Sequence, residues 1–271
     1  MINKPSASAY LLVIHGSPDS RPLSAAKQLA QMVEQQQVFR STRGQNSAYG
    51  AQKLLLRQNP PIVGTASLEF APLPLCQSIE QFALQAYSQG FQYLKILPLF
   101  LLEGVHVRTD IPKEVAWAQK ALGEKIKLQI CPYLGSNPAM VELLAQQFAL
   151  MPAQGRILIS HGSRRCHANQ KIAEIASQLK ATAAYWSLAP SLEEQVKALV
   201  AQSYHTIAMV PYFLFRGGIT GAIASQVEQL QTKFPQTKLI LGNPIGASPQ
   251  LAQIIVSLCN FSGEELPSHS I

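Results

Sequence analysis

The stretch LVIHGS at residues 12–17 decides the fold, because a closely similar stretch, LISHGS, occurs again at residues 158–163. A later block is repeated as well: LPLFLLEGVH at residues 97–106 returns as VPYFLFRGGI at residues 210–219. The blocks keep the same order in both halves of the chain. This pattern indicates an internal duplication with two similar domains in tandem.

The two copies differ at residues that could do chemistry. Aligning SLEFAP with the later WSLAP on their prolines pairs Glu69 with Ser187, and the longer repeat pairs His106 with Ile219. Duplication preserves what folding needs while one copy is free to drift. We therefore expect the shared residues to be scaffold, and Glu69 and His106 to belong to a site in the first half.

Length and composition agree with two domains. At 271 residues the chain is about twice the usual domain size. Its 47% hydrophobic and 14% charged residues allow two buried cores and exclude a disordered chain. We expect domains at residues 8–151 and 155–261, joined where Pro152 and Gly155 stop a helix.

Short apolar runs alternate with longer periodic stretches in each half, which predicts an α/β fold with a central parallel sheet in each domain. The predicted strands are Tyr10–Ile14, Ile62–Ser67, Tyr93–Pro98, Lys127–Cys131, Arg156–Ser160, Ala183–Trp186, Thr206–Pro211 and Lys238–Leu241. Predicted helices include Leu23–Gln37, Ile111–Leu122, Pro138–Leu150 and Pro249–Leu258. The first half also carries an insertion, mainly Phe39–Pro60, for which a substrate lid and a solvated loop both stay open.

Several classes of protein are excluded. The longest apolar runs are too short to span a bilayer, and the N-terminal region lacks the pattern of a secretory signal, so we expect a cytoplasmic protein. The net charge of +7 is dispersed and does not form the basic stripe of a nucleic-acid binder. Four cysteines without a C-x-x-C pair predict reduced thiols and no iron–sulfur cluster.

Three polar side chains follow three predicted strands of the first half: His15, Glu69 and His106. Ligands of open α/β sheets bind at the carboxyl ends of the strands, so we expect these side chains to meet. Such a trio can bind a divalent first-row metal or supply a general base. The turn at Gly16 and Ser17 can cap a helix or bind an anion, whereas the G-x-S-x-G elbow of a serine hydrolase is absent.

The H-G-S motif, the glutamate before a proline and LPLFLLEGVHVRTDIP at residues 97–112 resemble the class II chelatases. The resemblance is greatest to the two-domain form of sirohydrochlorin cobaltochelatase and ferrochelatase. It implies two flavodoxin-like, three-layer chelatase domains with an acidic tetrapyrrole between them. It further implies that Co²⁺ or Fe²⁺ is inserted as a substrate, with release of two protons, in sirohaem or cobalamin biosynthesis, and that no cofactor is tightly bound.

The resemblance also implies roles for individual residues. His15 and His106 match the metal-binding histidines, and Glu69 matches a carboxylate that joins them at the metal or receives a pyrrole proton. Substrate contacts are expected from Ser17, Phe100, Leu101, Arg108, Phe213, Phe215 and Arg216. The second half departs from the motif at Ser187 and Ile219, so we expect a single active site, with the role of His161 open.

Two other functions compete with this one. The first is a hydrolase or phosphatase that uses a histidine at a strand end, and the second is a non-catalytic carrier of tetrapyrrole or metal. The duplication favours a monomer, because one chain already supplies both walls of a cleft. The sequence does not distinguish cobalt from iron.

Overall fold

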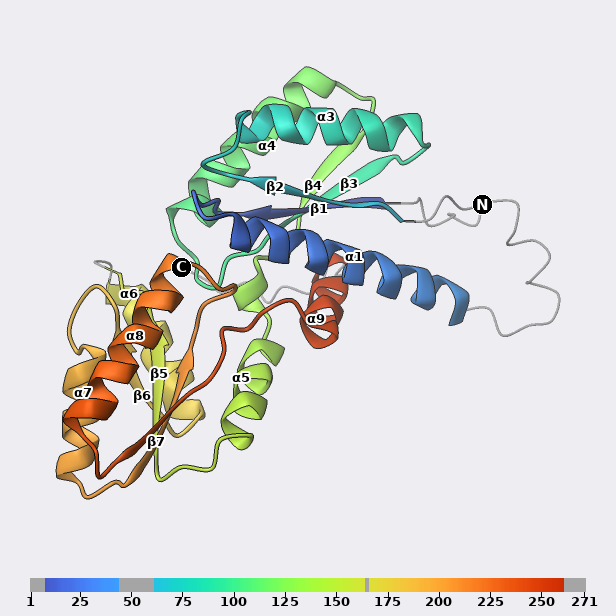
Figure 1. The fold of residues 1–271 in the computed structure, drawn as a ribbon. Coiled ribbons are helices and arrows are strands. Elements are labelled where there is room, and N and C mark those ends of the chain that lie inside the picture. Colours follow the sequence, from blue (N-terminus) through green and yellow to red (C-terminus); the bar gives the residue numbers. More distant parts are fainter. Residues whose placement is uncertain (1–7, 44–60, 164–165, 261–271) are drawn as a thin grey trace, which may run out of the picture.

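The computed structural model describes residues 8–43, 61–163 and 166–260, and it contains two parallel sheets (Figure 1). The first sheet has the order β2-β1-β3-β4 and consists of β1 (Ser8–Ile14), β2 (Val63–Ser67), β3 (Tyr93–Pro98) and β4 (Lys127–Ile130). The second has the order β6-β5-β7-β8 and consists of β5 (Gly155–Ser160), β6 (Thr182–Tyr185), β7 (Thr206–Pro211) and β8 (Lys238–Leu241). The predicted tandem of α/β domains with parallel sheets is confirmed.

The duplicated strands occupy matching positions in the two sheets. Leu12 of β1 lies opposite Leu97 of β3, and Leu158 of β5 lies opposite Val210 of β7. Successive β1 side chains point alternately into two different apolar clusters, so the strand is buried on both faces. This burial explains why LVI is a continuous apolar run instead of an alternating one.

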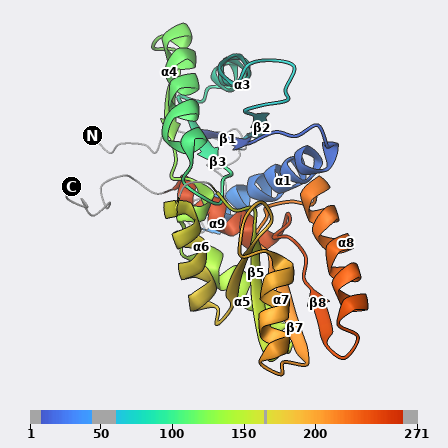
Figure 2. The same ribbon diagram turned by 90° about the vertical axis from the view of Figure 1, so that its left-hand side faces the viewer.

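Helices cover both faces of each sheet (Figure 1 and Figure 2). The helices of the first half are α1 (Ser20–Arg43), α3 (Leu75–Ser88), α4 (Ile111–Leu122) and α5 (Ala139–Ala149). Those of the second half are α6 (Cys166–Gln178), α7 (Leu192–Ala201), α8 (Gly218–Lys233) and α9 (Pro249–Cys259). Helices α3 and α4 pack on one face of the first sheet, and α7 and α8 pack on the corresponding face of the second.

The last helix of each half packs on the sheet of the other half. Helix α9 lies beside α1 under the first sheet, and α5 lies against β7 of the second (Figure 1). Lys95 Nζ on β3 donates a hydrogen bond to the Cys259 carbonyl oxygen at 2.6 Å, which ties the end of α9 to the first sheet. On α5, the Phe148 ring lies 5.5 Å from the Arg156 guanidinium of β5. We call β1–β4 with α1, α3, α4 and α9 the first lobe, and β5–β8 with α5–α8 the second lobe.

Because α5 and α9 each pack on the sheet of the other half, the two halves of the sequence do not coincide with the two lobes. The predicted domains at residues 8–151 and 155–261 divide the two sheets, but each sequence half gives its final helix to the other lobe. Sequence periodicity shows that a helix has an apolar face, but it does not show which sheet that face meets.

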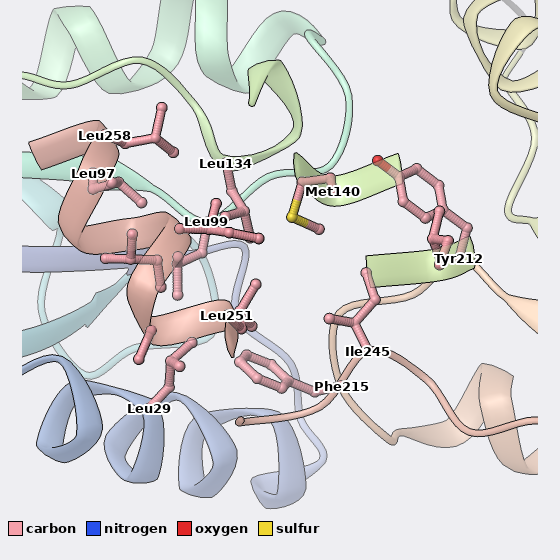
Figure 3. Packing of buried hydrophobic residues seen from close by; sticks show 14 of the residues in the cluster. Leu29, Leu97, Leu99, Leu134, Met140, Tyr212, Phe215, Ile245, Leu251 and Leu258 are labelled. Carbon is pink, nitrogen blue, oxygen red and sulfur yellow. The ribbon is translucent and has the colours of Figure 1, made fainter. Parts of the chain in front are cut away.

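A single hydrophobic core runs between the lobes (Figure 3). It includes Leu29 of α1, Leu251 of α9, Phe148 of α5 and Val210 of β7, each with no exposed side-chain surface. The buried Tyr212 hydroxyl donates a hydrogen bond to the Leu101 carbonyl oxygen at 3.4 Å, so a polar contact also crosses between the halves. The shared core holds the two lobes together as one packed unit.

Helix α1 departs from its predicted bounds. It runs from Ser20 to Arg43, longer than the predicted Leu23–Gln37, and so takes up the start of the Phe39–Pro60 insertion. Residues 44–60 of that insertion lie outside the described residues. In the described ranges, no helix combines the length and hydropathy that crossing a bilayer requires.

Candidate metal centre

The structure brings His15, Glu69 and His106 together at the carboxyl edge of the first sheet. His15 directly follows β1, Glu69 follows β2 and His106 lies in the connection after β3. One ligand atom from each side chain lies within 4.8 Å of the other two. The imidazole rings of His15 and His106 are 4.9 Å apart between centroids and nearly perpendicular, at 81°.

The glycine at position 16 allows the Glu69 backbone to pack closely against the turn that follows β1. The Glu69 amide donates a hydrogen bond to the His15 carbonyl at 2.8 Å, which places the Glu69 backbone against the turn after β1. Gly16 has φ +97°, and a Cβ at this position would lie 1.9 Å from the Glu69 carbonyl oxygen. Any other residue would therefore be strained and would displace Glu69. The shared H-G-S motif thus contains both scaffold and site.

His106 is held by a carboxylate four residues later in the chain. Residues His106–Asp110 form a π-helical turn that runs into α4, a feature that often marks functional sites. His106 Nδ1 lies 2.7 Å from Asp110 Oδ2, and because an ionised carboxylate only accepts, Nδ1 carries the proton. His106 Nε2 is therefore the nitrogen with a free lone pair.

His15 is also oriented by a contact of its Nδ1, but this contact is longer and its acceptor is an uncharged carbonyl. Its Nδ1 lies 3.1 Å from the Gly16 carbonyl oxygen, an acceptor, so Nε2 is again the basic nitrogen. Two imidazoles and a carboxylate form a ligand set that suits divalent first-row metals. Three protein ligands leave coordination positions open, and the exposure of His15 and Glu69 gives an ion access from solvent.

Phe100 is a predicted substrate residue that lies beside this centre. Its ring centroid is 6.3 Å from that of His15 and 5.9 Å from that of His106. Phe100 is half-buried and follows β3, so it forms an apolar wall beside the metal ligands. The adjacent Leu101 is also half-buried and packs against the shared core.

Other predicted substrate residues have partners of their own. Arg108 is exposed and pairs with Glu103 at 2.8 Å, and this carboxylate raises the pKa of the guanidinium. Ser17 Oγ accepts a hydrogen bond from the Asp19 amide at 3.1 Å. Hydrogen bonds from Arg21 lower the pKa of Asp19 to about 2.

The remaining three predicted residues belong to the second lobe. Arg216 is exposed and donates to Asn243 Oδ1 at 2.6 Å, and Phe213 is half-buried on the α7 and α8 side of its sheet. Phe215 is only 8% exposed and packs in the shared core near Leu29 and Leu251 (Figure 3). Phe215 therefore has a packing role, and its expected contact with the substrate stays a prediction.

A sequence profile of the CbiX family matches residues 9–150 and 155–260, which together make up most of the chain. The chain belongs to the CbiX family.

Among relatives of this CbiX protein is the sirohydrochlorin ferrochelatase of Priestia megaterium. It is 27% identical over 208 residues, covering 72% of this chain and 76% of that protein. SirB from Bacillus subtilis subspecies spizizenii, solved in complex with cobalt, has a TM-score of 0.65 at 20% identity and covers 93% of this chain and 94% of its own. CbiX, described as the terminal enzyme of sirohaem biosynthesis in denitrifying bacteria, has a TM-score of 0.53 at 22% identity and covers 92% and 96%. The predicted membership of the class II chelatases is confirmed.

The second lobe of this CbiX protein keeps the scaffold but not the centre. The Ser187 amide donates to the His161 carbonyl at 2.9 Å, as Glu69 does to His15, so the alignment of Glu69 with Ser187 holds in three dimensions. The Ser187 hydroxyl also donates to that carbonyl, at 2.8 Å. Ile219 packs against an apolar cluster, and no comparable ligand group forms among the described residues of this lobe.

A separate cavity of about 560 Å³ lies in the second lobe. It lies between Trp186 at the end of β6, Leu192 of α7 and Gln226 of α8. None of the three metal-centre side chains lines it. The centre of the CbiX protein is instead an open edge of the first sheet, as suits a site that an ion must enter and leave.

Asp110 is the site residue that the sequence did not reveal. Its place before Ile111 and Pro112 is typical of a helix start. From the sequence, Asp110 is therefore interpreted as part of that helix start and not as a partner of His106. The i, i+4 spacing of His106 and Asp110 is a signal that could have found it, because residues four apart meet on one face of a helix.

Proposed function

We propose that this CbiX protein is a chelatase that inserts Co²⁺ or Fe²⁺ into sirohydrochlorin and releases two protons. The observation that carries the proposal is the meeting of His15, Glu69 and His106 within 4.8 Å, on the first lobe alone among the described residues. The Priestia megaterium relative, a sirohydrochlorin ferrochelatase, and the cobalt held by SirB support the same reaction.

The first step that we propose is transient capture of the metal substrate. His15 and His106 present basic Nε2 atoms, and Glu69 adds an anionic oxygen. Three exposed or half-exposed ligands hold an ion without enclosing it, so the ion can pass onward to a ring. A closed four-ligand cage would retain the metal and oppose the reaction.

The second step is proton removal. A free-base tetrapyrrole must lose two N–H protons as the metal enters, and a positioned base assists that loss by about 10²–10⁴-fold. Glu69 is the acceptor that we assign, because its carboxylate is exposed and adjacent to both imidazoles. It either joins the metal or receives the proton, and both roles need the same position.

Binding of the acidic substrate is assigned to residues around the centre. Arg108 and Arg216 are exposed cations that can pair with carboxylates, and the pair of Arg108 with Glu103 lies in solvent, where ion pairs are weak and can be exchanged. Phe100 supplies an apolar wall next to the imidazoles, and we keep Ser17, Leu101, Phe213 and Phe215 as proposed substrate contacts.

The hydrolase alternative has little support in the geometry. Ser17 Oγ accepts the Asp19 amide, and His15 Nδ1 faces the Gly16 carbonyl. A nucleophile–base pair between Ser17 and His15 is therefore not formed in the described part of the chain. A non-catalytic carrier differs from an enzyme only in turnover, and the experiment below measures it.

The test compares three histidines by single substitution to alanine. Metal insertion into sirohydrochlorin is followed by absorbance under anaerobic conditions, with Co²⁺ or Fe²⁺ and with a protein-free control. We expect His15→Ala and His106→Ala to lower kcat/KM by about 10²-fold or more, as expected for a lost ligand or base. His161→Ala is the matched control, because it removes the same motif histidine from the second lobe, and it should have a small effect.

Equal losses from all three variants would contradict a single centre. Wild-type protein that binds the pigment without accelerating insertion would show a carrier. The ratio of kcat/KM for Fe²⁺ and Co²⁺ in the same assay identifies the preferred metal.

We also propose that the protein acts as a monomer in the cytoplasm. One chain supplies both lobes, and Cys76, Cys131 and Cys259 are free thiols of the kind that a reducing compartment preserves. Size-exclusion chromatography with light scattering measures the oligomeric state.

A further inference from the structure

An aromatic side chain stands in solvent directly after a metal-centre residue. Phe70 follows Glu69 in the chain and is 65% exposed, the most exposed aromatic side chain in the described residues. Val105, which is 38% exposed, directly precedes His106. Each of these two exposed apolar side chains is therefore a chain neighbour of a metal-centre residue.

The backbone at Phe70 is held in an unfavourable conformation. Phe70 has φ +54°, in the left-handed region that a bulky side chain rarely adopts. Strain of this kind persists only where the surroundings impose it, and it concentrates at functional sites. The Glu69 backbone, fixed against Gly16 and bonded to the His15 carbonyl, is the surrounding that imposes it here.

The duplication supplies an internal control for this position. Phe70 corresponds to Leu188 of the second lobe, because Glu69 corresponds to Ser187. Leu188 has no positive φ, is half-buried and packs against the shared core. Its Cγ lies 2.9 Å from where a Cβ on Gly162 would stand, so it covers the turn of its own H-G-S motif.

The same turn in the first lobe is covered by backbone instead of a side chain. A Cβ on Gly16 would meet the Glu69 carbonyl oxygen, so the chain after β2 takes a different path there. That path presents the Glu69 carboxylate at the centre and leaves Phe70 outside the core. The lobe with a metal centre thus exposes an aromatic ring where the lobe without one buries an aliphatic side chain.

We propose that Phe70 is a substrate-contacting residue whose ring packs on the flat face of the tetrapyrrole. This inference rests on the proposed function, because the partner is the ring that receives the metal. A tetrapyrrole has an apolar conjugated face and an acidic rim, and an aromatic ring recognises the face by stacking and by removal of apolar surface from water. Phe100 is a second aromatic wall at the same centre, on the side of β3.

The test measures pigment binding and metal binding separately. Affinity for metal-free sirohydrochlorin is measured by fluorescence quenching, affinity for Co²⁺ by calorimetry without the pigment, and KM and kcat by absorbance. For Phe70→Ala we expect the Kd and KM for sirohydrochlorin to rise about tenfold, the size of one aromatic contact. The Co²⁺ affinity should stay within about twofold, because Phe70 offers no metal ligand.

Two further variants separate contact from backbone strain. Phe70→Trp keeps a stacking ring and should restore binding to within a few-fold of wild type. Phe70→Gly should bind the pigment as weakly as Phe70→Ala but melt at an equal or higher temperature, because glycine adopts φ +54° without strain. Tyr87→Ala, which removes a 49% exposed aromatic side chain from α3, is the matched control and should change none of these values.

An unchanged Kd and KM for sirohydrochlorin in Phe70→Ala would overturn the inference. A parallel fall in Co²⁺ affinity would also overturn it, because Phe70 would then act by holding Glu69 in place. If wild-type protein did not accelerate insertion, the proposed function would fail, yet pigment binding by wild type and Phe70→Ala would still test the contact.

Discussion

At the scale of single residues, the two imidazoles of the centre are supported unequally. His106 Nδ1 donates a hydrogen bond to the Asp110 carboxylate at 2.7 Å, whereas His15 Nδ1 faces only the Gly16 carbonyl at 3.1 Å. A carboxylate behind a ligating histidine fixes the ring and raises the basicity of its other nitrogen. His106 is therefore the better-oriented ligand of the pair, and Asp110 is its positioning residue.

The substitution Asp110→Asn tests this support. Asparagine keeps the size of the side chain but removes the charge, so Co²⁺ affinity and kcat/KM should each fall by about 10–100-fold. Calorimetry with Co²⁺ and the insertion assay give these two values. Glu193→Gln in the second lobe removes a charge from an exposed ion pair and serves as the control. Wild-type affinity in Asp110→Asn would show that the contact has no role at the centre.

The residues of the centre were predictable to different degrees. His15, Glu69 and His106 could be selected because the duplication marks which polar residues the second half has lost or kept. Asp110 was harder to select, because its i, i+4 spacing from His106 indicates a contact only if both residues lie on one helical turn, and the structure shows that turn. The substrate contact expected of Phe215 stays a prediction, because an apolar residue in a repeated motif is equally consistent with a wall and with a core, and Phe215 packs in the shared core.

At the scale of elements, strand and helix positions follow the sequence closely. β3, β7 and β8 have their predicted bounds, as does α4, because apolar runs and turn residues delimit them sharply. Helix α7 shows the local chemistry that sets such a boundary. Ser191 Oγ accepts the Glu194 amide at 3.3 Å, and Glu194 Oε2 accepts the Ser191 amide at 2.7 Å, so both ends of a capping box are present.

Removing the cap should destabilise the protein measurably. We expect Ser191→Ala to lower the free energy of unfolding by about 1 kcal/mol, because the Glu194 amide loses its acceptor. Urea denaturation measures the change. Ser191→Asp, which keeps an acceptor at the cap, should retain wild-type stability. A loss of equal size in both variants would show that the hydroxyl acts in some other way.

The same cap predicts a pH dependence. Hydrogen bonds from the Ser191 amide and hydroxyl lower the pKa of Glu194. A carboxyl whose folded pKa is lowered stabilises the protein above its ordinary pKa, and that contribution is lost as pH falls through the lowered value. The stability difference between wild type and Glu194→Ala should therefore shrink on acidification below the ordinary range of glutamate. A difference that grew at acid pH would contradict the bonding.

At the scale of the whole molecule, the exchanged helices and the shared core join the lobes. Leu251 of α9 comes from the second half of the sequence, yet it is fully buried in the cluster that contains Leu29 of α1 (Figure 3). The sequence could not show this pairing, because an apolar helix face does not indicate which of the two sheets it packs on. Because the core is shared in this way, we expect the lobes to unfold together.

The substitution Leu251→Ala tests this coupling. It should cost about 2–5 kcal/mol, as a fully buried leucine does, and should leave a single cooperative transition. Far-UV and near-UV circular dichroism should give the same midpoint in urea. Leu150→Ala, at a leucine that is 84% exposed, is the control and should leave stability unchanged. Two separate transitions in the leucine variant would show that the lobes fold independently.

The exchange of α5 and α9 also constrains how such a chain can be divided. A cut within residues 150–154 would release two fragments, each lacking the helix that covers one face of its own sheet and carrying the helix that belongs to the other. Neither fragment alone could bury the apolar face of its sheet, so we expect the two fragments to associate as an obligate heterodimer. A gene that lost its second half would therefore not encode a smaller working enzyme until a new helix, or a second copy of the first half, covered the exposed sheet.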